Sequence, residues 1–588
     1  MATAASLKSI DSLTGVDARM EALNRLERLA DEAAAEIARH RSNLLLKRGI
    51  KAWRRGEIVR AGQWALKSTE MDPTNAKAFH VLAMALERMG HLHKSLVTYE
   101  RAFELDPSDP ELLINLGLTA WNLKLNDAAA RMFQLYVEAC PHSPLGYNNL
   151  GSVMYDLGSA EMAIETLRAA IYRMPQEAIL WNSLATVLAE EGRAEESLVF
   201  YNEAVRLEPG FARGYHNLGY AYQHLGQLEE ALENYDRALE HAVDPGERME
   251  SRHSRSICLI GAGQIEEGFR EYEIRNSERF RAYFHHMINA PRWNGEPVEG
   301  MKLLLVGEQG LGDEFMFANI LPDVIRDLGP DGKLQIAVDP RLVPLFQRSF
   351  PEAEVGTYDD RTLIDKDGNK ALRLIPFASN GNEPDMWAPM GSALPVYRKA
   401  LSDFPHKPFL IPDPSRVAEF KAQLAKLPGK KVGVCWRSMM LEAKRAKYFS
   451  PIDGWAPLLK TEDVSFINLQ YGDCAEEIAR ARDKYGVTIH QIEGLDLRND
   501  IDGTAALCAA LDLVLSAPTA AAATAASVGA KVWFLAAGRT WPQLGTDEYP
   551  WYADTRVMTP KNFADWASLM PEVSAALTDF AAGNAKTR

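Results

Sequence analysis

Cysteine is scarce in this chain of 588 residues. The five cysteines lie far apart and no two form a CxxC pair, namely Cys140, Cys258, Cys435, Cys474 and Cys508. Their spacing supports neither a zinc knuckle nor a thioredoxin-type redox site. An odd, sparse set of cysteines is typical of a reducing compartment, so we expect a cytoplasmic protein.

Long apolar runs and an excess of basic charge are also missing. The first residues contain no apolar core of signal-peptide length, and the alanine-rich stretch Thr504–Gly538 is interrupted by Asp512, Pro518 and Lys531. We therefore expect no insertion into a membrane. With 65 basic against 80 acidic side chains, the net charge of -15 argues against a nucleic-acid binder and against a polybasic membrane anchor.

Proline and leucine recur at a fixed interval of 34 residues in the first half of the chain. The recurring positions are Pro73, Pro107, Pro141, Pro175 and Pro209, and Leu82, Leu116, Leu150, Leu184 and Leu218. A small residue follows each leucine, and Gly90, Gly158, Gly192 and Gly226 mark the middle of the repeats. We expect each leucine to lie in the core of the stack, its small neighbour to let the paired helix approach closely, and each proline to start the next helical unit. This pattern predicts tetratricopeptide repeats, which are helical hairpins stacked into a solenoid with a concave groove.

We expect the solenoid to run over residues 43–275, with its phase slipping after Pro209. Residues 1–42 contain an amphipathic segment that we expect to cap the stack, and a coiled-coil dimer helix is the alternative. A stack of this kind binds an extended peptide or another protein; the alternative is that it only dimerises the chain.

Three asparagines stand directly before the recurring leucines, at Asn115, Asn149 and Asn217, whereas Ser183 holds the same position in the repeat between them. Because an amide offers both a donor and an acceptor, these side chains are candidate contacts to the backbone of an acceptor peptide. The alternative is that each amide caps or bridges its own repeat.

The second half of the chain changes character. Residues 276–300 resemble a connector, and residues 301–410 and 411–575 then alternate apolar strand patterns with helical patterns, before a tail at 576–588. The strand patterns are 302–309, 333–339, 354–358, 430–438, 464–473, 487–494, 511–517 and 531–537. Alternation of this kind predicts an α/β module with mainly parallel sheets. Two Rossmann-like halves that meet at residues 400–415 make a GT-B glycosyltransferase arrangement plausible, with a ligand bound at the carboxyl ends of the strands.

The segment GEQGLGDEF (307–315) follows the first strand of this module and opens a helix. Gly310 and Gly312 allow the backbone to approach a ligand closely. The segment lacks the Gly-Lys-Ser/Thr of a P-loop, and Phe315 stands where a dinucleotide fingerprint has its third glycine. Asp313 is our candidate general base; the alternative is that it caps the helix.

Candidate contacts to a donor phosphate lie at the ends of later strands. They are Arg437 and Ser438, the basic residues Arg445 and Lys447, and Thr519 at the start of an alanine-rich helix. For the basic residues the alternative is a solvated loop, and for Thr519 it is simple capping. Gln470 and Tyr471 lie at the end of a strand and are candidate contacts to the base or sugar of the donor. The alternative is that they form an ordinary turn at the strand exit. Trp541 and Trp551 are candidate walls of a nucleotide pocket, although such rings are more often core.

These residues carry a family resemblance over nearly the whole chain. The segments LLLVGEQGLGDEFMFA, VGVCWRS, NLQYGD, LDLVLSAPTAAAATAASVGAKVWFL and WPQLGTDEYPWY resemble bacterial tetratricopeptide-repeat glycosyltransferases, above all the alphaproteobacterial flagellin glycosyltransferases. The resemblance implies that the repeats dock flagellin and that the α/β module moves a nonulosonic acid from a CMP donor to Ser or Thr. Asp313 matches the proposed base of the related heptosyltransferase-like family.

The chain departs from that family's pattern at two positions, because Pro518 and Ala523 stand where an aspartate and a histidine are usual. The pairs Asp365/Asp367 and Asp500/Asp502 lie in turn-like segments away from the expected cleft, so we expect transfer without a metal or another cofactor. Two alternatives stay open: a UDP-hexose or GlcNAc transferase acting on protein, and a non-catalytic flagellin chaperone or scaffold.

Overall fold

The computed structural model describes residues 16–278, 284–308, 310–365, 368–439 and 443–584. Internal contacts divide the chain into two compact units. The first consists of Met1–Met174 with the short segment Ile364–Asn369, and the second consists of Pro175–Leu363 with Lys370–Arg588. The two units are described separately.

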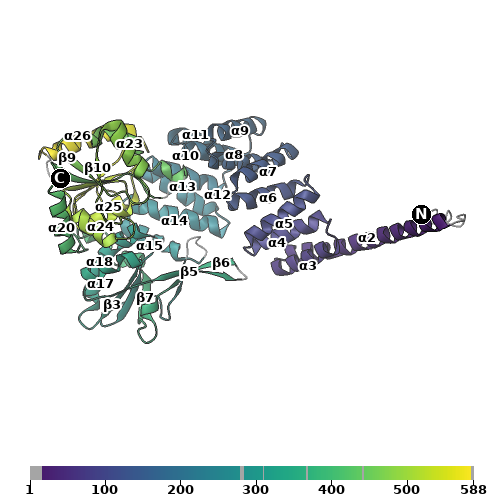
Figure 1. Cartoon of the computed structure of the whole chain (residues 1–588), viewed down its shortest axis with the longest axis horizontal. Helices are drawn as coiled ribbons and strands as arrows, with labels where there is room; N and C mark the ends of the chain where they lie inside the picture. The colour runs from purple at the N-terminus through teal and green to yellow at the C-terminus, as the bar shows by residue number, and fades with distance from the viewer. Residues whose placement is uncertain (1–15, 279–283, 309, 366–367, 440–442, 585–588) are drawn as a thin grey trace. The chain divides into compact units, whose positions relative to one another are not determined.

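The first unit is a run of helices that pack as consecutive hairpins. Their bounds are α2 (Val16–Arg54), α3 (Ile58–Met71), α4 (Ala76–Arg88), α5 (Leu92–Leu105), α6 (Pro110–Asn122), α7 (Asn126–Ala139), α8 (Pro144–Asp156) and α9 (Ala160–Arg173). Helix α2 runs without a break through residue 42, where we expected the cap to give way to the repeats (Figure 1). Residues 19–41 of α2 include no buried side chain, and burial begins at Ser42.

Small residues let the two helices of a hairpin approach closely, as the pattern predicts. A Cβ atom on Gly117 of α6 would lie 2.6 Å from the ring of Phe133 in α7, and one on Gly151 of α8 would lie 2.8 Å from Leu167 in α9. Both distances are shorter than van der Waals contact, so neither glycine can be replaced without moving the partner helix. The 34-residue pattern thus encodes helix–helix contact.

The turns between paired helices require a left-handed backbone. Gly90 and Gly158 have φ angles of 78° and 77° there, but the corresponding residue between α6 and α7 is Lys124, with φ 63°. The recurring prolines do not begin the next helix as we expected. Pro73, for example, follows Asp72, the C-cap of α3, and α4 begins only at Ala76. A proline just after a helix end prevents the helix from continuing.

The second unit begins with repeats of the same kind. Their helices are α10 (Ala178–Glu190), α11 (Ala194–Leu207), α12 (Ala212–His224), α13 (Leu228–His241), α14 (Pro245–Gly261) and α15 (Ile265–Tyr272), followed by the 3-10 turn η1 (Glu273–Asn276). The leucines Leu184 and Leu218 are buried in α10 and α12, which confirms their predicted place in the core of the stack. Helical hairpins of the tetratricopeptide type are therefore present in both units.

Two parallel sheets follow the repeats. One has the order β4-β3-β2-β7 and the other has the order β10-β9-β8-β11-β12-β13, and every pair of neighbouring strands within them is parallel. The strands are β2 (Lys302–Val306), β3 (Lys333–Val338), β4 (Glu354–Thr357), β7 (Met386–Pro389), β8 (Lys430–Cys435), β9 (Val464–Asn468), β10 (Ile489–His490), β11 (Leu513–Ser516), β12 (Val532–Leu535) and β13 (Thr555–Met558). A third sheet has the order β1-β6-β5, from β1 (His285–Met287), β5 (Asp359–Asp365) and β6 (Gly368–Leu374). Strand β1 lies inside the stretch 276–300 that we expected to be a connector.

Helices cover the sheets. They are α16 (Leu311–Phe317), α17 (Leu321–Leu328), α18 (Val343–Ser349), α19 (Leu394–Tyr397), α20 (Pro414–Leu424), α21 (Ala443–Ala446), α22 (Ala456–Leu459), α23 (Ala475–Tyr485), α24 (Ile501–Ala510), α25 (Ala520–Ser527) and α26 (Trp566–Ala581) (Figure 1). Helix α26 continues past residue 575, where we expected the tail to begin. In both sheets the strand order reverses next to the first strand, β2 or β8, as it does where α/β folds bind ligands.

One apolar core joins the last repeat to both parallel sheets. It contains Phe269 and Tyr272 of α15, Leu305 of β2 and Trp551 of the segment before β13. The Phe269 and Trp551 rings meet edge to face at 6.0 Å. The end of the solenoid and the α/β module therefore form one folded body within the second unit. No helix in the described part of the chain is both long and apolar enough to span a bilayer.

Candidate functional site

The loops that leave both parallel sheets enclose a cavity of about 440 Å³, which we call the central cavity. The segments that line it follow β2, β8, β9, β11 and β12. Eight predicted site residues line it, namely Gly310, Gly312, Asp313, Ser438, Arg445, Tyr471, Thr519 and Trp541. The carboxyl ends of parallel strands meet at one edge of a sheet, and this geometry gathers residues that are far apart in the sequence.

Asp313 lies in the first turn of α16, but it does not cap that helix. Gly310 is the N-cap residue, and α16 has no side-chain cap. No group among the described residues donates a hydrogen bond to the Asp313 carboxylate. Burial, together with the nearby Glu308 carboxylate, raises the pKa of Asp313 to about 7, although Arg275 opposes the shift. An unpaired carboxyl group with a pKa near neutrality is suited to proton transfer.

The glycine loop that carries Asp313 is held by a buried ion pair with the end of the repeats. Arg275 of η1 donates two hydrogen bonds to the Glu308 carboxylate, at 3.0 Å and 2.7 Å. Glu308 also accepts a hydrogen bond of 2.7 Å from the backbone NH of Gly391. Fixed in this way, the loop holds its backbone against the cavity. Sequence reasoning missed this pair because its two members lie in different elements.

Glu314, the neighbour of Asp313, points into the protein instead. Its carboxylate accepts hydrogen bonds from the Tyr358 hydroxyl at 2.6 Å and from the backbone NH of Asp339 at 3.0 Å. Burial raises the pKa of Glu314 to about 7, and the two hydrogen bonds oppose the shift. Adjacent carboxyl groups thus have different tasks, because Glu314 organises the α16 turn while Asp313 faces the cavity.

Thr519 lies opposite the glycine loop, at the start of α25. Its side chain does not cap α25, so the simpler of the two interpretations of this residue does not hold. The Thr519 hydroxyl is 3.2 Å from the Ser516 hydroxyl and 3.6 Å from Cys435 Sγ. Thr519 lines the central cavity beside Ala520 and Ala523, so the uncapped first turn of α25 faces the same space as Asp313.

Two predicted donor contacts at strand ends have structural partners instead. Arg437 forms an ion pair with Glu477, to which Nε donates at 2.8 Å, and it also donates 2.8 Å to the backbone carbonyl of Asp473. The buried Gln470 side chain accepts hydrogen bonds from the backbone NH groups of Trp436 and Arg437, at 3.1 Å and 3.0 Å. Neither Arg437 nor Gln470 lines the central cavity.

Lys447 also has a different place from the one expected. Its Nζ atom is 2.7 Å from a carboxylate oxygen of Glu190 in α10, so its charge is neutralised by the repeats. Of the three basic residues predicted to hold a phosphate, Arg445 lines the central cavity, and it is exposed. The partners of Arg437 and Lys447 lie 40 and 257 residues away in the chain, too far for a sequence pattern to reveal.

The walls of the central cavity include aromatic residues that the sequence analysis passed over. These are Phe449, Phe534, Tyr549 and Tyr552. Tyr549 is fixed by a 2.8 Å hydrogen bond between its hydroxyl and that of Thr540. Both tyrosines belong to the segment WPQLGTDEYPWY, from which we had selected Trp541 and Trp551. Trp541 lines the cavity, whereas Trp551 is fully buried in the apolar core. The many aromatic residues of that segment were the sequence signal that could have identified these tyrosines.

Two of the three predicted groove asparagines form bridges between repeats. In the first unit, Asn115 lies 3.0 Å from His80 Nε2; in the second, Asn217 donates a 3.0 Å hydrogen bond to Asn182. Each bridge joins a residue to the one 35 positions earlier. Asn149 differs because that earlier position holds Ile114. Its buried Nδ2 group has no hydrogen-bond partner among the described residues.

Metal ligands do not gather in the described part of the chain, where no group of three or more His, Cys, Asp or Glu side chains could hold an ion. Asp500 and Asp502 instead pair with Arg416 and Arg348. The side chains of Asp365 and Asp367 lie outside the described residues.

Comparison with known proteins agrees with the repeat assignment. The Tetratricopeptide repeat family matches residues 80–144, 148–212 and 212–244. Among solved structures, the chain is 27% identical to a thermophilic TPR protein of Thermus thermophilus, TTC0263, over 30% of this chain and 96% of that one, with a TM-score of 0.27. It is 24% identical to YrrB, a TPR protein with an unusual peptide-binding site, over 33% of this chain and 98% of that one, with a TM-score of 0.24.

The fold and the cavity together define a tetratricopeptide-repeat protein whose last repeats are built into an α/β module with parallel sheets. A relative covers both parts. Protein FlbA of Caulobacter vibrioides (strain ATCC 19089 / CIP 103742 / CB 15) is 41% identical over 571 residues, which are 97% of this chain and 94% of that protein. The chain therefore belongs to the FlbA family.

Proposed function

We propose that this chain is a protein O-glycosyltransferase with a GT-B-like module, which attaches a nonulosonic acid from a CMP donor to Ser or Thr residues of flagellin in the cytoplasm. The observation that carries the proposal is the unpaired Asp313 carboxyl group, with its pKa raised to about 7, in a cavity at the carboxyl ends of two parallel sheets. The donor and acceptor classes rest on the family resemblance of the sequence.

The chemistry is a single displacement without a metal. Asp313 takes the proton of the acceptor hydroxyl as the hydroxyl oxygen bonds to the anomeric carbon of the sugar. The bond from that carbon to the phosphate oxygen breaks, and its electron pair leaves on CMP. Displacement from the opposite face inverts the anomeric centre.

The lining residues supply contacts that suit such a donor. Arg445 places a positive charge at the cavity, and Thr519 and the first turn of α25 offer hydrogen-bond donors to the leaving phosphate. Tyr471 and Trp541 provide flat surfaces against which a base or sugar packs. The repeats supply a groove for the acceptor protein.

A scaffold without catalytic activity is the second candidate. It is favoured by the neutralisation of Arg437 and Lys447 by Glu477 and Glu190, which leaves Arg445 as the remaining cation of the three expected. A scaffold would bind flagellin through its repeats and would not need Asp313.

The test is the intact mass of flagellin co-produced with this chain and a nonulosonic-acid pathway, for the wild type and for Asp313→Asn. We expect flagellin mass to rise in steps of one sugar with the wild type and to stay unchanged with the variant. Asp331→Asn, which changes an exposed aspartate of the same module, is the matched control and keeps full transfer. Flagellin of the same mass with the wild type and with Asp313→Asn would favour the scaffold.

A measurement of the melting temperature separates the CMP-linked from the UDP-linked class of donor. We expect CMP to raise the melting temperature of the chain and UDP to leave it unchanged.

A further inference from the structure

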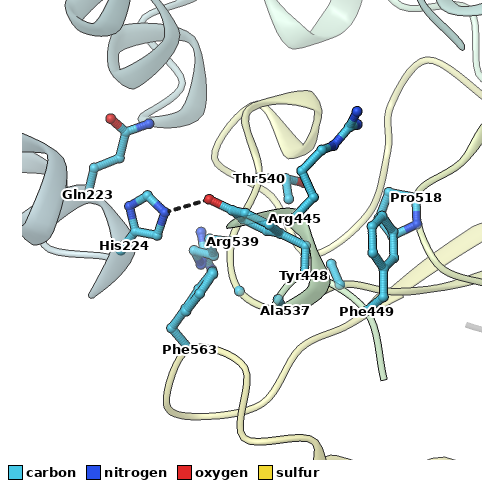
Figure 2. Close-up of a pocket in the computed structure, with 12 residues that line it drawn as sticks. Gln223, His224, Arg445, Tyr448, Phe449, Pro518, Ala537, Arg539, Thr540 and Phe563 are labelled. Atoms are coloured by element: carbon cyan, nitrogen blue, oxygen red, sulfur yellow. Dashed lines mark hydrogen bonds between the residues drawn. The ribbon is translucent and has the colours of Figure 1, made fainter. Parts of the chain in front are cut away.

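A second cavity of about 330 Å³, which we call the side cavity, lies where α12 meets the sheet ends of the same unit. Figure 2 shows its lining: Gln223 and His224 from α12, Tyr448 and Phe449 from the segment after α21, residues 536–540 after β12, and Phe563. Phe449, Phe563 and Tyr448 give it aromatic walls. The repeats therefore form one wall of this cavity.

The side cavity adjoins the central cavity, since Arg445, Phe449 and Pro518 line both. A third space of about 470 Å³, the inner cavity, shares other residues with the central cavity, among them Gly310 and Tyr471. The central cavity with Asp313 thus has two neighbours with different linings. Arg498 lines the inner cavity but not the other two, whereas Arg539 lines the side cavity alone.

Contacts with the repeats hold the wall of the side cavity in place. The Tyr448 hydroxyl is 3.1 Å from His224 Nε2 and 3.2 Å from the Tyr220 hydroxyl, both in α12. The His224 ring packs edge to face on Phe563 at 4.9 Å. The neighbouring Lys447–Glu190 pair adds a charged contact to α10. Helices α10 and α12 thus hold the segment with Lys447 and Tyr448 in place beside this cavity.

Positive charge lines the side cavity. Among the described residues that line it, Arg445 and Arg539 carry guanidinium groups and none carries a carboxylate. Arg539 pairs with Asp547, but the Asp547 side chain is 93% exposed, so that the pair is weak and open to exchange. Positive charge at this point stands out in a chain whose net charge is -15. It is complementary to an acidic ligand.

We propose that the side cavity binds an acidic stretch of the acceptor polypeptide next to the hydroxyl that is modified, an inference that rests on the proposed transfer to protein. Arg539 pairs with the acceptor's carboxylates, and the aromatic walls pack against its chain. Arg445, which lines both cavities, stays with the donor phosphate. The acceptor hydroxyl then enters the central cavity past Phe449 and Pro518, while the donor occupies the central and inner cavities.

The test is the affinity of the full-length chain for purified flagellin from the same organism, measured by calorimetric titration without donor. Arg539→Glu is expected to weaken flagellin binding at least tenfold and to leave the affinity for CMP unchanged. Arg498→Glu, the matched reversal in the inner cavity, is expected to weaken CMP binding and leave flagellin binding unchanged. Melting curves of both variants establish that they are folded.

A second variant guards against a misleading single substitution. Ala537→Trp fills the side cavity without removing a charge and is also expected to weaken flagellin binding. Unchanged flagellin affinity in both Arg539→Glu and Ala537→Trp would overturn the proposal, as would a loss of CMP binding in Arg539→Glu with flagellin binding intact. Both affinities are measured by titration and do not depend on sugar transfer. A wild type that binds flagellin through Arg539 but transfers no sugar would therefore refute the proposed function and leave only the docking of an acidic stretch in the side cavity.

Discussion

The repeats before Met174 and those after Pro175 share one sequence pattern but differ in what they pack against. Tyr99 of α5 is buried among residues of α4, α6 and α7 alone. Phe269 of α15, in contrast, belongs to a core that includes both parallel sheets. The comparison teaches that the 34-residue period specifies the hairpin but not its surroundings. The later repeats act as part of the α/β module.

Breaking the buried ion pair between η1 and the glycine loop is expected to have the largest effect on stability. Arg275→Met leaves the Glu308 carboxylate buried without its partner, which costs about 3–5 kcal/mol in the free energy of unfolding. Denaturant titration of the whole chain measures it. Arg237→Met, which removes an exposed pair with Glu233, is the control and costs less than about 1 kcal/mol. Equal costs for the two variants would contradict the integration of η1 with the module.

Truncating one buried ring in each set of repeats sharpens the comparison. Phe269→Ala and Phe133→Ala each remove a fully buried phenyl ring and cost about 3–5 kcal/mol. The two substitutions differ in which elements they destabilise, and amide hydrogen exchange measures this difference. Phe269→Ala is expected to speed amide exchange in β2 and around Trp551, whereas Phe133→Ala is expected to do so in α6–α8. Faster exchange in β2 with Phe133→Ala alone would reverse our assignment.

The Asp313 carboxyl group makes the module sensitive to pH. Its folded-state pKa of about 7 lies above the unfolded value of 3.8, so between these values the folded chain holds a proton that the unfolded chain has lost. Stability therefore falls as the pH rises from about 4 to 7. Asp313→Asn removes this penalty and is expected to stabilise the chain by about 2 kcal/mol at pH 8, a value reduced for the partial exposure of the group. At pH 4 the variant and the wild type should unfold alike; a constant difference at both pH values would contradict the raised pKa.

The smallest expected effect concerns one turn in the first repeats. Lys124 adopts a left-handed backbone at a position that is glycine in neighbouring repeats, so Lys124→Gly is expected to stabilise the chain by about 0.5–1 kcal/mol. Gly158→Ala, at the matching turn with φ 77°, is expected to destabilise it by about 1 kcal/mol. Thermal unfolding compares the two, and a loss of stability with Lys124→Gly would show that the lysine side chain matters more than its backbone.

Much of the fold was accessible from the sequence because its determinants are local and periodic. The 34-residue spacing located the hairpins, and the small residues such as Gly117 marked helix contact correctly. Strand patterns in the sequence located β2, β3, β4, β8, β9, β10, β11 and β12. Strands β1, β5, β6, β7 and β13 escaped prediction, since they are short or polar and are defined by their pairing with other strands rather than by a long apolar pattern.

The residues of the candidate site could likewise be predicted only in part. Residues directly after strands, such as Asp313, Ser438 and Thr519, converge because the sheet geometry forces them to. The sheet geometry does not determine where a long side chain points. Arg437 and Lys447 follow the same strand, yet each turns to a carboxylate that only the tertiary structure brings near. A position after a strand could therefore be predicted, but not the partner that a flexible cation chooses.

The central claim is that Asp313 activates an acceptor hydroxyl in the cavity between the sheets. The most direct test is the initial rate of sugar transfer from CMP-nonulosonic acid to purified flagellin, followed by intact mass across pH 5–9 with the wild type and Asp313→Asn. We predict a wild-type rate that rises with pH through an apparent pKa of about 7 and a variant slower by at least about 100-fold. Transfer by Asp313→Asn at the wild-type rate, with the same pH dependence, would contradict the claim.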